Sequence, residues 1–149
     1  MVSPARIIKR LIPGDYSTAS GYPGAEEQSE WFVEEVRARV PELVDLPDEE
    51  VEEKALDALE WAVRETCRQV EWWEHSPETG AHVGLYLYAC EHPETGRYYM
   101  VVHEEHYSDI DEHYVGFTLT RSYGEARRAF RDLVRDWEER LADEEGLAD

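Results

Sequence analysis

The chain has 149 residues, with 35 Asp and Glu against 15 Lys and Arg, and a formal net charge of -20. A surface this acidic repels nucleic acids and anionic membranes, so direct binding to either class is not expected. The 42% of apolar and 11% of aromatic residues are too many for a disordered acidic tail, and the length is typical of one domain, residues 1–149.

Residues 1–24 are predicted to form an N-terminal arm and a loop. Residues 6–12 read as a short strand or extended arm closed by Pro13 and Gly14, and residues 16–24 are rich in Ser, Gly and Pro, as loops are. The first 14 residues contain basic side chains and no acid, so we expect them to lie against the acidic body. They show no secretory cleavage site, and no apolar run reaches the ~20 residues of a membrane span, which favours a cytoplasmic protein.

Residues 25–75 are predicted to be helical. A first helix covers residues 26–40, and a second runs from Pro47 to about Glu74 with three acids in its first turn. Trp61 and Trp72 are eleven residues apart, so on one long helix they share a second apolar face. That face either packs inside the domain or forms an interface with a partner or a second copy.

The segment Asp48–Glu60 carries seven acids and one lysine. On a helix this is one net charge per ~3.3 Å, close to the ~3.4 Å between phosphates along one DNA strand. The segment is therefore a candidate contact for a basic partner or a phosphate mimic, against the simpler interpretation of a solvated helix surface. Its candidate partner-binding residues are Glu52, Glu53, Asp57 and Glu60.

Residues 81–121 are predicted to form a β-meander, with strands at 81–92, 97–107 and 113–121. Two Pro-Glu-Thr-Gly segments, at 77–80 and 93–96, are turn signals. If the residue numbers of each cross-strand pair in the first hairpin sum to 189, Leu85 and Met100 share a core face. The opposite face is then rich in rings, and it supplies the candidate partner-binding residues Tyr86, Tyr88, Tyr99, His103, Glu105 and Tyr114. The alternatives are a face covered by the arm or a helix, or an ordinary solvated sheet.

A cluster of His and acidic residues ends the second of these strands. His106 and His113 are cross-strand neighbours in the predicted register, and Asp109 and Asp111 lie in the loop between them. These four residues are the candidate ligands of a divalent metal, although solvated or mutually paired side chains explain them as well. No other cofactor is indicated.

The last helix is predicted over residues 122–144, opened by a Ser122–Glu125 capping box. Its arginines are expected to pair along the helix or to dock the acidic helix of a second copy. Cys67 and Cys90 have no metal spacing and are interpreted as buried reduced thiols.

These elements predict an α+β fold, a three- to four-stranded antiparallel meander packed against three helices in the order (β)-α-α-β-β-β-α. No motif indicates catalysis, so the expected function is a non-enzymatic acidic protein that binds a basic protein partner or a larger assembly, as an inhibitor, immunity or viral component does. The alternatives are a nucleic-acid mimic that inhibits a DNA-binding protein, and a salt-adapted small metal-dependent enzyme. The acidity would also fit a halophilic host or its virus.

Overall fold

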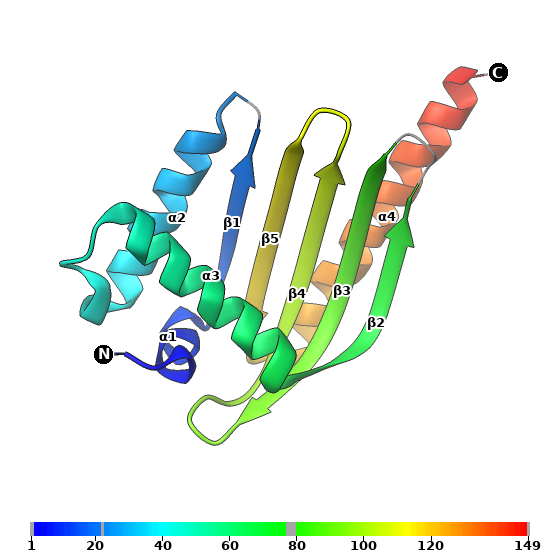
Figure 1. Ribbon diagram of the computed structural model, residues 1–149. Coiled ribbons are helices and arrows are strands. Elements are labelled where there is room, and N and C mark those ends of the chain that lie inside the picture. The colour runs from blue at the N-terminus through cyan, green and yellow to red at the C-terminus, as the bar shows by residue number, and fades with distance from the viewer. Residues whose placement is uncertain (1, 22, 77–79, 149) are drawn as a thin grey trace.

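The computed structural model describes residues 2–21, 23–76 and 80–148 and shows one antiparallel sheet between two helical layers (Figure 1). In chain order the elements are α1 (Pro4–Leu11), β1 (Gly14–Ser20), α2 (Ala25–Arg39), the short 3-10 helix η1 (Pro41–Leu43), α3 (Asp48–Glu65), β2 (Cys67–His75), β3 (Ala81–His92), β4 (Gly96–Tyr107), β5 (Glu112–Thr120) and α4 (Tyr123–Ala148). The strand order is β1-β5-β4-β3-β2. The predicted α+β class and antiparallel meander are confirmed, with five strands instead of three to four among the described residues.

Each face of the sheet has its own core. On one face, here the α3 face, Tyr98, Met100 and Leu119 pack with apolar residues of α1, α2 and α3. On the other, the α4 face, Leu85 and Val101 pack with the apolar side of α4. Alternate side chains of β3 and β4 are therefore buried on both sides, and the second face is covered by a helix, one of the alternatives that the sequence left open.

The N-terminal prediction is wrong in its secondary structure. Residues 4–11 form a helix whose N-terminal turn is capped by the Ser3 side chain, which accepts from the Arg6 amide at 3.2 Å. The predicted loop contains β1, because Tyr16 and Thr18 alternate inward and the strand pairs with β5. The basic head does lie on an acidic residue, since Arg6 and Arg10 both reach Glu42, at 3.1 and 3.6 Å.

The predicted long helix is two elements. The helix α3 ends at Glu65, where the Thr66 hydroxyl donates to the Ala62 carbonyl at 2.7 Å, and residues 67–75 form β2. This segment contains Val70, Trp72 and Trp73, residue types that favour strands. Trp61 and Trp72 consequently lie on different elements, so the predicted second apolar face does not exist.

The β3–β4 register differs from the prediction by one residue. In the structure the residue numbers of each cross-strand pair sum to 188, with Leu85 opposite His103 and Tyr86 opposite Val102. A slip of one residue moves every side chain of one strand to the other face. The predicted β4–β5 register is confirmed, with Val102 opposite Phe117 and His106 opposite His113.

The prediction that Cys67 and Cys90 are reduced thiols is also wrong. Cys67 begins β2 and pairs directly with Cys90 of β3, and the two sulfurs form a disulfide at 2.02 Å. The prediction failed because it placed Cys67 on a helix, where no cross-strand partner was available.

The arginines of α4 have mixed partners. Arg127 and Arg131 reach Glu71 of β2, at 3.9 and 3.2 Å, and Arg135 pairs with Asp132 along the helix. Of the two predicted turns, 93–96 is confirmed, whereas residues 77–79 lie outside the described residues.

Candidate functional site

The helices cover only part of the α3 face. Along β4, alternate residues on this face change from fully buried Tyr98 and Met100 through Val102, 8% exposed, to half-exposed Glu104 and exposed His106. In Figure 1, α3 crosses in front of the sheet towards the start of β2, while α4 lies behind it. The ends of β3 and β4 away from their hairpin are therefore left open on this face.

The orientation of α3 shows which of its sides borders the open region. Trp61 packs its ring against His92 at the β3–β4 hairpin, with ring centroids 5.2 Å apart. Leu56 and Val63 lie about 140–160° from Trp61 around the helix. Leu56, Val63 and Trp61 are all partly buried against the core of the α3 face, so the position of Leu56 and Val63 opposite Trp61 is what places them on the flank turned away from the hairpin.

Five residues make the centre of the open region, and we call them the aromatic–acidic patch: Trp72, Glu74, Tyr86, Tyr88 and Glu104. Trp72 is opposite Tyr86 in the sheet, and Glu74 and Glu104 are both opposite Gly84, one from each side. Trp72 is 62% exposed and both tyrosines are half-exposed. The patch thus combines three aromatic side chains with two carboxylates on three adjacent strands.

Hydrogen bonding holds Tyr86 in place within the patch. Its hydroxyl donates to Oε1 of Glu74 at 2.9 Å, and its ring lies 6.3 Å from that of Tyr88. Burial, the hydrogen bond to Glu74 and the negative charges of Glu74 and Glu104 raise the pKa of Tyr86. Burial and Glu104 raise the pKa of Tyr88 in the same direction. Both phenols stay protonated and neutral at physiological pH.

Gly84 provides the space for the Tyr86 ring. A Cβ atom on Gly84 would lie 2.3 Å from the Tyr86 hydroxyl oxygen and 2.6 Å from a ring carbon. The ring therefore lies along the strand and over the glycine, within reach of Glu74. Any side chain at this position would displace it.

The other predicted tyrosine-face residues do not join the patch. Because of the one-residue register difference, Tyr99, His103, Glu105 and Tyr114 lie on the α4 face. The predicted single ring-rich face is therefore wrong, and its residues divide between the two sides of the sheet.

His103 and Glu105 belong to a polar cluster under α4. Nε2 of His103 lies 3.0 Å from Glu105 and 3.3 Å from Nε1 of Trp137, and Tyr107 donates to Glu105 at 2.6 Å. Burial alone would raise the pKa of Glu105, but the hydrogen bonds from His103 and Tyr107 outweigh it and hold the pKa below its usual value. These contacts join β4 to α4, so the cluster is explained by its contribution to packing α4 on the sheet.

The acidic residues of α3 occupy two of its sides. Glu53, Asp57 and Glu60 are exposed on the ridge opposite the buried residues Ala55, Ala58 and Ala62. Within the described residues no basic side chain makes an ion pair with these three carboxylates. Glu52 is half-buried on the Leu56 flank, where burial and the charge of Glu49 raise its pKa.

The predicted metal ligands are only partly brought together. His106 and His113 have ring centroids 5.6 Å apart, and His113 contacts Glu104 at 3.5 Å. Asp109 lies beside Gly80, and Asp111 has a positive φ of 51° in the turn before β5. Over residues 2–21, 23–76 and 80–148, no cluster of three or more His, Cys, Asp or Glu side chains is arranged to hold a metal. Metal binding stays a prediction.

No protein-family model, no curated protein and no solved structure matches the chain. Among the described residues, no helix has the length and apolar character that crossing a membrane requires. The candidate site is therefore argued from its own geometry.

Sequence reasoning missed the pairing that defines the patch. Glu74 was placed at the end of a helix, and Glu104 was considered only within the His-rich segment. The signal that could have found them is the strand character of residues 70–73, which would have placed Trp72 and Glu74 beside β3.

Proposed function

We propose that the chain is a non-enzymatic acidic binding protein that engages a basic protein partner through the aromatic–acidic patch and the adjacent ridge of α3. The observation that carries the proposal is the patch itself. Exposed Trp72 and half-exposed Tyr86 and Tyr88 lie on an open sheet face next to the carboxylates of Glu74 and Glu104. Exposed rings of this kind are found at protein interfaces more often than on other surfaces.

The chemistry of the patch suits arginine and lysine side chains. A cation over the face of a Trp or Tyr ring contributes about 0.5–2 kcal/mol, and a neighbouring carboxylate adds a charge-assisted hydrogen bond. Because its hydroxyl is held by Glu74, the Tyr86 ring is ordered before a partner arrives. Such preorganisation reduces the entropic cost of binding.

The net charge gives the proposal its long-range component. A charge of -20 attracts a basic protein and raises its association rate at low ionic strength. The ridge of Glu53, Asp57 and Glu60 extends the negative surface beside the patch, and none of these carboxylates is neutralised by an ion pair among the described residues.

Affinity capture from an extract of the source organism tests the proposal. We expect the wild-type protein to retain a basic protein that is lost on reversing the α3 ridge (Glu53→Lys, Asp57→Lys, Glu60→Lys) and weakened by Trp72→Ala. The matched control reverses three exposed acids of α4 (Glu138→Lys, Glu139→Lys, Asp143→Lys) and changes the net charge by the same amount. The control should retain the partner.

Two outcomes would contradict this assignment. Equal loss in the α3 and α4 variants would mean that binding follows net charge and not this surface. Unchanged binding in the α3 and Trp72 variants would place the contact elsewhere.

The same experiment addresses nucleic-acid mimicry. The acids of Asp48–Glu60 lie on α3, but Asp48 pairs with Arg37, so fewer than the six net charges counted from the sequence are available to mimic phosphates. Release of a captured DNA-binding protein by duplex DNA would identify its partner surface as a phosphate site. If salt releases the captured protein but duplex DNA does not, mimicry of nucleic acid is excluded and binding of a basic partner by charge is supported.

A cytoplasmic location remains a proposal. The disulfide between Cys67 and Cys90 points towards an oxidising compartment, because such bonds are rare in the reducing cytosol. Thiol alkylation during cell lysis distinguishes the two, since a cytosolic protein would have both cysteines labelled.

A further inference from the structure

Within the part of the chain that the structure describes, one edge of the strand β1 has no strand partner. It lies at the end of the sheet, with β5 on one side and α2 along the other (Figure 1). Such an edge presents backbone amide and carbonyl groups that can pair with another extended chain. This edge is remote from the aromatic–acidic patch, which involves β2, β3 and β4.

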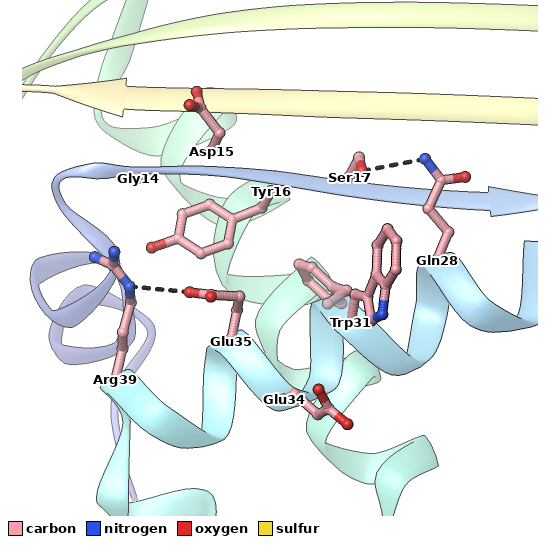
Figure 2. A pocket seen from close by; sticks show the side chains of 10 residues that line it. Gly14, Asp15, Tyr16, Ser17, Gln28, Trp31, Glu34, Glu35 and Arg39 are labelled. Atoms are coloured by element: carbon pink, nitrogen blue, oxygen red, sulfur yellow. Dashed lines mark hydrogen bonds and ion pairs between the residues drawn. The ribbon is translucent and has the colours of Figure 1, made fainter.

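A cavity of about 680 Å³ lies between this edge and α2. From β1 it is lined by four consecutive residues, Gly14–Ser17, and from α2 by Gln28, Trp31, Phe32, Glu34, Glu35 and Arg39 (Figure 2). Consecutive residues of a strand point to opposite faces of the sheet. A cavity that touches all four must therefore contact the backbone edge of β1 and not one face alone.

The inner wall of the cavity is apolar and fixed. Tyr16 and Phe32 are buried and meet edge to face, with ring centroids 6.4 Å apart. The Tyr16 hydroxyl donates to the Leu11 carbonyl, and burial raises the pKa of Tyr16 to about 12. With only 4% and 2% of their surfaces exposed, these two rings form a closed floor beneath the groove.

The rim is acidic and carries an exposed tryptophan. Asp15, Glu34 and Glu35 line the cavity with a single basic residue, Arg39, which pairs with Glu35 at 3.5 Å and donates to the Pro13 carbonyl. Two carboxylates therefore remain for a ligand. Trp31 is 68% exposed, and Figure 2 shows it rising from α2 beside the cavity.

We propose that this groove is a second binding site, which takes an extended cationic peptide segment by strand addition to Gly14–Ser17. Four residues of β1 span about 13 Å, so the groove accommodates a segment of four to five residues. Alternate side chains of the segment would face the Tyr16–Phe32 wall, and its arginines or lysines would reach Asp15, Glu34 and the face of Trp31. The site uses other elements than the proposed patch and stands independently of it.

A synthetic peptide, acetyl-Arg-Val-Arg-Val-Arg-amide, tests the groove by NMR titration of the isotope-labelled protein. We expect the largest shifts at the amides of Gly14–Ser17 and at the Trp31 indole. Trp31→Ala should weaken binding by about threefold or more, from the loss of a cation–π contact. Ile110→Ala, which removes another strongly exposed apolar side chain outside both sites, should leave peptide binding unchanged and is the matched control.

Peptide variants separate strand addition from charge attraction without altering the protein. Methylating two backbone nitrogens of the peptide keeps its charge and removes two donors, so we expect at least about tenfold weaker binding. Equal affinity of the methylated peptide would overturn strand addition. Shifts confined to the patch residues Tyr86 and Tyr88 would overturn the groove as the site while supporting the proposed function.

Discussion

At the scale of single residues, the position of one tyrosine ring depends on one glycine. The Tyr86 ring lies over Gly84, and its hydroxyl reaches Glu74 on the next strand. The same arrangement recurs at Gly14, where the Tyr16 ring lies over the glycine. A Cβ atom added to Gly14 would lie 2.4 Å from the Tyr16 hydroxyl oxygen. Glycine at these positions is required for close approach and not for an unusual backbone angle.

The stability of the folded protein should depend on pH through Glu105. Its pKa is lowered in the folded protein, so its interactions add stability above the usual carboxyl pKa of 4.5, and that stability is lost as the pH falls through the lowered value. Glu105→Gln should destabilise the protein at pH 7 by about 1.5–3 kcal/mol and reduce the loss of stability on acidification. Urea unfolding at pH 7 and pH 4 measures both effects.

Glu104→Gln is the control for this prediction, because Glu104 is the neighbouring carboxylate and points to the other face of β4. A loss of stability at pH 7 as large in the control as in Glu105→Gln would contradict the special contribution of the cluster under α4.

At the scale of elements, the sequence predicted best those segments with a strong local signal. The helix near residues 26–40 and the strands near 81–92, 97–107 and 113–121 are confirmed, because periodicity and turn residues agreed there. The boundary between α3 and β2 was missed, because Val63, Cys67 and Val70 fit a helical stripe as well as a strand. Only the tertiary pairing with β3 decides between these alternatives.

The candidate site was harder to predict than the fold, for a related reason. The choice of which tyrosines share a face depends on a one-residue difference in the β3–β4 register, and the turn sequence alone does not determine it. Tyr86 and Tyr88 were correctly placed together. Their carboxylate neighbours could not be found without β2.

The disulfide gives an element-scale prediction, because it joins the start of the edge strand β2 to the end of β3. Closing a loop across a sequence separation of 23 residues contributes about 3 kcal/mol through the unfolded chain. Cys67→Ala/Cys90→Ala should therefore lower the free energy of unfolding by about that amount, measured in urea.

Reduction of the wild-type protein should produce the same loss, whereas the double variant should be insensitive to reductant. Two freely reactive thiols in the protein purified without reductant would contradict the disulfide. Unchanged stability on reduction of the wild-type protein would contradict its contribution to folding.

At the scale of the whole molecule, its own basic residues neutralise the acidic surface unevenly. Ion pairs gather around Glu42, Asp48 and Glu71, and they join α1 to η1, α2 to α3, and β2 to α4. The ridge of α3 and the open region of the α3 face are left without arginine partners among the described residues. Acidic side chains without arginine partners in the described part of the chain therefore lie beside the exposed rings of the patch.

Hydroxyl-radical footprinting of the protein, free and bound to its captured partner, tests the central claim most directly because it reports side-chain exposure of each Trp and Tyr. In the free protein we expect strong labelling of Trp72, intermediate labelling of Tyr86 and Tyr88, and little of Tyr98. Binding should protect Trp72, Tyr86 and Tyr88 and leave Tyr123, which is exposed at the start of α4, unchanged. Protection of Tyr123 with continued labelling of Trp72 would show that the partner binds the other face.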